Sequence, residues 1–258
     1  MLRPKLFLTF VMSVICALAS LLHAQEQIPV GTVIPIVLDR ALDSRSSKPG
    51  QRFVASVAQE VPLPDKHVIR VGSKIFGEVT ETENIPGQAK LGLRFDRLEF
   101  GKDQIAIGTK LRALASSLDV NSAKAMYADS ERNIAATATT NQIGGTSAVF
   151  RAAGAVENEN GEKIGTPVYG GVLAVVTNQR GSKCESIPLA ETPQAVWLFS
   201  PEVCGVYGFR DIQFENGIDS KSGEILLLRK NKKDWKWTNI NLSAGSAMLL
   251  AVTGTTGH

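Results

Sequence analysis

The chain has 258 residues, with 28 basic and 25 acidic side chains and a formal net charge of +3 at neutral pH. Arg3 and Lys5 belong to the N-terminal segment, and the rest of the chain has 26 basic and 25 acidic residues. A nucleic-acid-binding protein normally carries a basic excess on one face, so this balance argues against nucleic acid as a partner.

Residues 1–24 have the layout of a secretory signal peptide, with a basic start, an apolar stretch from Leu6 to Leu22 and a small residue, Ala24, before polar Gln25. The apolar stretch is just short of the ~18 to 20 residues that a spanning helix needs, which favours cleavage. Leu22 fits a cleavage site poorly, so an uncleaved anchor remains the alternative. We expect an exported protein, periplasmic, outer-membrane-associated or extracellular, that touches a membrane only through this segment.

One short phrase occurs four times: a small or apolar residue, Gly, a hydroxyl residue and then an apolar run. Because Gly reaches backbone conformations closed to other residues, each phrase predicts a turn that opens a strand. We predict that the first and last strands, Thr32 to Leu38 and Ala247 to Val252, are equivalent sheet edges that pair with each other when a barrel closes. The four copies begin with Val30-Gly31-Thr32, Val71-Gly72-Ser73, Ile107-Gly108-Thr109 and Ala244-Gly245-Ser246.

From residue 27 to about residue 114 the sequence is dense in strand signals. Odd positions are apolar from Leu91 to Phe95, whereas even positions are apolar at Leu98 and Phe100, so the alternation slips near Asp96. A slip of one residue is the signature of a β-bulge. After it, residues 101–103 predict a tight turn into a hairpin.

The segment from Ser116 to about Gly165 differs in composition, being rich in Ala, Ser, Thr, Asn and Gly. Two interpretations are open: the segment is a mobile loop, or it forms one or two marginal helices around residues 123–127 and 148–155. We favour partial helix, because a structureless connection of this length inside a compact domain is unusual. This insertion is the best compositional candidate for a functional projection.

Cys184 and Cys204 are the two cysteines that remain after the signal segment. In an exported chain an even count predicts a disulfide, which here closes a loop of 20 positions and contributes about 3 kcal/mol. Two free thiols or a metal pair are the alternatives, although no second His or Cys pair has ligand spacing. Beyond this loop, Ile225 to Leu228 predicts a further strand.

The sequence offers no catalytic motif, and we expect no enzyme activity, cofactor or metal. A Ser-His-Asp or Cys-His catalytic arrangement would have to use His67. A histidine on the protein surface without a catalytic role is the simpler interpretation of this residue. Asp211, Glu215, Asn216 and Asp219 lie around Gly217, and an ordinary acidic turn explains them better than a calcium loop. A glycosidase needs two paired carboxylates, and five acidic residues of the strand-rich half could supply them. The same residues are equally expected on the solvent-exposed face of a sheet. They are Glu78, Glu81, Glu83, Asp96 and Glu99.

Trp235 and Trp237 lie two positions apart, so both rings face the same way on a strand. They form a candidate platform for a sugar or a lipid. Burial of both rings under the sheet is the competing interpretation.

The N-terminal half resembles a known family. The quoted phrases resemble, in order and spacing, the C-terminal β-barrel of the TrbI-like scaffold proteins of bacterial conjugation and type IV secretion. The resemblance covers residues 27–114 and implies an antiparallel barrel in the bacterial envelope that acts by interaction rather than catalysis. The family has an inner-membrane anchor, a Pro-rich linker and an apolar helical projection, where this chain has a signal segment and a polar insertion. The phrases are Pro29 to Pro35, Pro49-Gly50-Gln51, Ile69 to Gly77 and Arg97 to Phe100.

We therefore expect an all-β protein, an antiparallel barrel or sandwich, forming one domain over residues 25–258 with the insertion at about 116–165. Two domains split at the insertion are the fallback. The expected function is a non-enzymatic envelope scaffold or interaction module that binds a protein partner or assembles with itself. A polysaccharide- or ligand-binding module is the alternative, and an exported hydrolase comes third.

Overall fold

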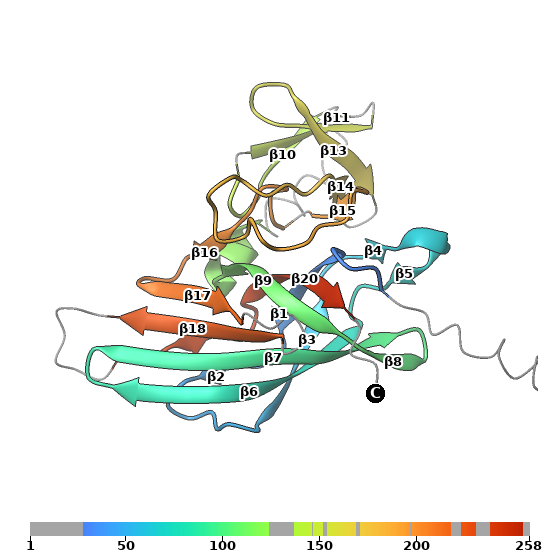
Figure 1. Ribbon diagram of the computed structural model, residues 1–258. Helices are drawn as coiled ribbons and strands as arrows, with labels where there is room; N and C mark the ends of the chain where they lie inside the picture. The colour runs from blue at the N-terminus through green and yellow to red at the C-terminus, as the bar shows by residue number, and fades with distance from the viewer. Residues whose placement is uncertain are drawn as a thin grey trace, which may run out of the picture.

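The computed structural model describes residues 28–123, 137–145, 147–151, 154–168, 171–196, 198–217, 223–230 and 238–254. Strands make up most of these residues, which confirms the all-β class. The expected signal segment lies outside the described residues. A large sheet forms one body of the fold, and a smaller sheet stands over one end of it (Figure 1).

The large sheet has ten strands, and its neighbours are antiparallel except for the parallel pair β16 and β9. Its spatial order is β16 (Gly205–Tyr207), β9 (Gly108–Ala115), β20 (Ala247–Gly254), β1 (Val33–Leu38), β3 (Arg52–Val57), β6 (Lys74–Ile85), β7 (Gln88–Phe100), β18 (Glu224–Lys230) and β17 (Ile212–Asn216), with β8 (Asp103–Ala106) paired to β7.

The first and last long strands pair as predicted. Strand β1 runs antiparallel to β20, with Val33 opposite Ala251 and Val37 opposite Ala247. Both strands are almost entirely buried, because their apolar runs lie in the middle of the sheet between β9 and β3. The predicted pairing is therefore confirmed, but the expectation that these strands are sheet edges is wrong, because each has a second neighbour in the sheet.

The large sheet bends until its far strand, β17, reaches back to β9. The Asn216 amide donates to the Leu111 carbonyl at 2.9 Å and accepts from the Leu111 N–H at 2.7 Å. These side-chain bonds bridge the gap, whereas no backbone ladder joins the two ends of the sheet over the described residues. Of the two expected shapes, the structure is the sandwich-like one.

The repeated Gly phrase opens a strand in all four places, but not always by the same geometry. Gly31, Gly72 and Gly245 have φ angles of 87°, 83° and 85° and precede β1, β6 and β20. These are left-handed conformations that favour Gly. Gly108 has no such angle and is itself the first residue of β9, so the expected turn is absent there.

The predicted bulge lies at Asp96. Arg97 is opposite Phe76 and Phe95 is opposite Gly77, which leaves Asp96 as the extra residue of β7. The inward face consequently changes phase, so that Phe95 and Leu98 are both fully buried. The hairpin into β8 also forms as predicted.

The smaller sheet has six antiparallel strands that begin inside the expected insertion and continue beyond it. Among the described residues of the insertion, residues 117–123 are helical, and most of the helix expected around residues 123–127 lies outside the described residues. The helix expected around residues 148–155 is wrong, because that segment forms two strands of a hairpin, and Phe150 is opposite Val156. The order is β10 (Thr137–Asn141), β11 (Ser147–Arg151), β12 (Ala155–Glu157), β13 (Lys163–Val168), β14 (Gly171–Ala174) and β15 (Gln194–Ala195).

Two short ribbons complete the fold. They are β2 (Leu42–Asp43) with β19 (Asn241–Leu242), and β4 (Val61–Pro62) with β5 (Val68–Ile69), the latter pair joined through a 3-10 turn, η1 (Pro64–Lys66).

Candidate functional site: a groove in the six-stranded sheet

A groove opens where β13 and β14 separate. The two strands form a hairpin in which Pro167 is opposite Val172 and Thr166 is opposite Leu173, and the pairing ends there. Gly165 marks the closed end, because a Cβ at this position would lie 2.6 Å from the Leu173 carbonyl oxygen. Beyond this point the strands diverge around a hollow of about 970 Å³.

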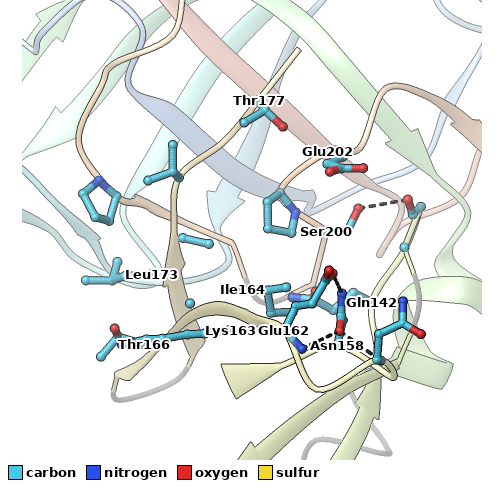
Figure 2. A pocket seen from close by; sticks show the side chains of 18 of the residues that line it. Gln142, Asn158, Glu162, Lys163, Ile164, Thr166, Leu173, Thr177, Ser200 and Glu202 are labelled. Atoms are coloured by element: carbon cyan, nitrogen blue, oxygen red, sulfur yellow. Dashed lines mark hydrogen bonds between the residues drawn. The ribbon is translucent and has the colours of Figure 1, made fainter. Parts of the chain in front are cut away.

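Side chains from two directions line the groove (Figure 2). Lys163, Ile164 and Thr166 of β13 lie along one side, and Ser200 and Glu202, from the loop before β16, lie along the other. Because these segments are far apart in sequence, the groove exists only in the folded six-stranded sheet.

Two glycines allow the loops of the far wall to pack closely. A Cβ on Gly145 would lie 2.4 Å from the Ser200 Cβ, and one on Gly144 would lie 2.4 Å from a Val203 methyl group. The Ser200 hydroxyl donates to the Gly144 carbonyl at 2.9 Å. This wall is thus held by backbone contacts and leaves little side-chain bulk in the groove.

The turn between β12 and β13 is organised by one amide side chain. Asn158 Oδ1 accepts from the N–H groups of Asn160 at 3.0 Å and Glu162 at 2.9 Å, and its Nδ2 donates to Glu162 Oε2 at 2.7 Å. This side-chain turn fixes the Glu162 carboxylate at the mouth of the groove.

The charges of the groove have no ionic partner among the described residues. Glu202 accepts a hydrogen bond from the neutral amide of Gln179 at 3.1 Å, and Glu162 accepts one from the amide of Asn158 at 2.7 Å. Within the described part of the chain, no ion pair involves either carboxylate or Lys163. Val175 adds an apolar side chain that is 51% exposed.

A second hollow of about 290 Å³ continues the groove toward the short helix. The two share Gln142, Gly144 and Tyr207 in their linings. The Tyr207 hydroxyl donates to the Cys204 carbonyl at 3.3 Å, and burial raises the pKa of Tyr207, so the phenol keeps its proton at neutral pH. Tyr207 therefore serves as a neutral wall rather than as a base.

The loop beneath the groove is closed by the predicted disulfide between Cys184 and Cys204, whose Cα atoms are 6.0 Å apart. A disulfide is compatible with an exported location. The loop that joins β14 to β15 and contains Cys184 spans residues 175–193.

A fully buried cation fastens this loop to the large sheet. Arg112 of β9 donates to the carbonyl oxygens of Thr177 at 3.0 Å and Val203 at 3.3 Å, and to Asn178 Oδ1. Burial lowers the pKa of Arg112 to about 10, so the guanidinium is still charged at neutral pH. Its acceptors are neutral groups, and no carboxylate among the described residues pairs with it.

The sequence-derived candidates do not converge on this groove. His67 is exposed and its ring lies 6.1 Å from that of Phe100, outside the groove lining. Asn216, which belonged to the candidate calcium turn, is used to bridge β17 and β9. Trp235 and Trp237 lie outside the described residues.

The candidate carboxylates of the large sheet are engaged in ion pairs and turns on its outer face. Asp96 pairs with Arg52 at 2.6 Å, and Glu83 with Lys90 at 2.9 Å. Glu99 accepts from the N–H of Lys74 at 3.1 Å. They therefore form the solvated face that the sequence suggested as the simpler interpretation.

Sequence reasoning missed the groove residues. Its only local signals were the Gly144-Gly145 pair and the Asn158-x-Asn160-Gly161 turn, and neither is specific. Within the described ranges no three His, Cys, Asp or Glu side chains gather as a metal site. The same residues include no helix with the length and apolar character needed to cross a bilayer.

No model of a known protein family, no curated protein and no solved structure matches this chain.

Proposed function

We propose that this chain is an exported, non-enzymatic protein of the bacterial envelope that acts as a β scaffold and interaction module. The observation that carries the proposal is the groove in the six-stranded sheet, whose charged rim has no ionic partner within the described part of the chain. Unpaired rim charges beside exposed apolar side chains are typical of an interaction surface.

The architecture supports this role because the large sheet forms a base and the six-stranded sheet attached to it carries the groove. The large sheet has a continuous buried core, and Arg112 and the disulfide hold the six-stranded sheet against it. The TrbI-like resemblance points the same way, since it concerns the strands of the large sheet. In that family a projection follows the hairpin that corresponds here to β7 and β8, and this chain continues from β9 into the six-stranded sheet.

The experiment is crosslinking with mass spectrometry in intact cells that produce the chain. A photo-crosslinking residue replaces Val175, at the groove, and in a matched control it replaces Val71, which is 56% exposed and lies outside the groove. We expect Val175 to return specific envelope proteins, or a second copy of the chain, and Val71 to return none of them. Equal, nonspecific crosslinking at both sites would refute the proposal. Glycan-array binding that depends on Trp235 and Trp237 would favour the polysaccharide-binding alternative.

A further inference from the structure

We infer that the groove binds an extended, basic segment of a partner protein, which joins the six-stranded sheet as an added strand. The inference rests on the proposed interaction function and deepens it, because it names the conformation and charge of what is bound.

The backbone supplies the first argument. Strand β14 remains paired to β15 through Leu173 and Ala174, and β13 remains paired to β12 through Gly165. Between them the ladder ends at Thr166 opposite Leu173, so residues 163–165 of β13 and Ala174 of β14 have no ladder partner on the groove side. An unpaired sheet edge is the surface to which an extended peptide adds by backbone hydrogen bonds.

Charge supplies the second argument. On the large sheet the carboxylates of Asp39, Asp96 and Glu83 each have a Lys or Arg partner within 2.9 Å. Among the described residues, the side-chain donors to the Glu162 and Glu202 carboxylates, at the groove, are the neutral amides of Asn158 and Gln179. Lys163 offsets one of these two charges and leaves the groove with an excess carboxylate, which a Lys or Arg of the partner would neutralise.

The apolar lining sets the remaining side-chain preference. Ile164, Leu173 and Val175 line the groove, and Val175 is half exposed. Successive side chains of an added strand point to opposite faces, so these residues would contact every second side chain of the peptide. The bound segment is therefore expected to alternate apolar with basic or polar residues. A sugar ring would need a stacking surface, and the one aromatic side chain among the described lining residues is Tyr207.

The test begins with a random decapeptide library displayed on phage and panned on the oxidised, full mature chain. We expect enrichment of peptides that alternate β-branched residues with Lys or Arg. The best peptide is then synthesised, and its affinity is measured by fluorescence anisotropy. N-methylation of alternate amides, which removes strand hydrogen bonds but keeps the side chains, should weaken binding at least about tenfold.

The matched variants separate charge from general surface effects. Glu162→Gln with Glu202→Gln keeps the hydrogen-bond acceptors but removes both charges, and we expect it to weaken the peptide about tenfold at low salt. Glu60→Gln with Glu215→Gln removes the same charge outside the groove and should leave the affinity unchanged. Circular dichroism confirms that the parent and both double variants are folded.

Three results would overturn the inference: no enriched peptide, enriched peptides without basic residues, or an affinity that N-methylation leaves unchanged. If any of these occurs while Val175 still crosslinks to envelope proteins, the strand-addition inference fails and the proposed function stands. If peptides bind as expected but no protein is crosslinked in cells, the groove chemistry holds and the envelope function fails.

Discussion

Replacing Arg112 should show how a buried charge without a carboxylate partner holds the two sheets together. Its guanidinium donates to the backbone carbonyls of Thr177 and Val203 and to the Asn178 side chain. Val203 lies inside the segment that the disulfide closes, and Thr177 and Asn178 lie in the loop before Cys184. Arg112→Met removes the charge and all the donors. Arg112→Lys keeps the charge but can satisfy only about one of the acceptors, because an ammonium lacks the fork of a guanidinium.

The estimated free energies predict which of the two variants is less stable. Hydrogen bonds from a charged donor contribute about 1.5 to 3 kcal/mol each, so Arg112→Met loses about 5 kcal/mol in all. Burial lowers the pKa of Arg112 from 12.5 to about 10, which corresponds to a cost of about 3 kcal/mol that methionine does not carry. The net loss for Arg112→Met is thus about 2 kcal/mol. Lysine keeps most of the burial cost and loses about two of the three bonds, so we expect a loss of about 3 kcal/mol.

Urea denaturation of the oxidised protein measures these free energies of unfolding, and hydrogen exchange at Ile187 and Val203 reports the loop locally. Lys110→Met, on the same strand and without an ion pair, is the control and should change stability by less than about 0.5 kcal/mol. A lysine variant as stable as the parent, or more stable than the methionine variant, would refute the reasoning.

Reducing the disulfide should lower the free energy of unfolding by about 3 kcal/mol, as urea curves with and without reductant would show. Gly31→Ala should cost about 3 kcal/mol or more in thermal unfolding, because its φ is 87° and its Cβ would lie 2.3 Å from a backbone nitrogen. Gly72→Ala, with φ 83° and open space around it, should cost about 1 kcal/mol. Partial burial alone would raise the pKa of Asp96, but hydrogen bonds and the charge of Arg52 lower it, so the unfolded state takes up its proton first. The stability from this pair should be complete above pH of about 4 and lost as the pH falls through the folded pKa; Asp96→Asn should flatten that acid limb, and an unchanged limb would contradict the assignment.

The strands of the large sheet were predictable because their signals are local. The alternation around Asp96 located the bulge, since burial of one face forces the phase of side chains on each side of it. The pairing of β1 with β20 followed from two apolar runs introduced by the same Gly phrase. In both cases the residues that carry the pattern are also the ones that are buried.

The six-stranded sheet was not predictable in the same way. Its strands are short and rich in Thr, Ala and Gly, so period-two alternation is weak, and residues 148–155 looked helical by composition. The groove depends on where the ladder between β13 and β14 stops, a property of pairing that single residues do not encode. Likewise, the sequence does not show that Glu162 and Glu202 have no ion-pair partner among the described residues, because this depends on which side chains lie next to them in the fold.

The attachment of the smaller sheet gives the first Gly phrase a role beyond starting a strand. The Gly31 carbonyl accepts from the Ala190 N–H at 3.1 Å, in the disulfide-closed loop, and the adjacent strand residue Val33 donates its N–H to Gln194 Oε1 at 3.1 Å. A side chain at Gly31 would collide with Leu189 and Ala190. Since β15, which lies beside β14 and the groove, begins at Gln194, a shift at Gly31 should pass directly into the strand that supports the groove. Gly31→Ala should therefore weaken binding at the groove, whereas Gly72→Ala, at a turn where the added Cβ would have open space around it, should not.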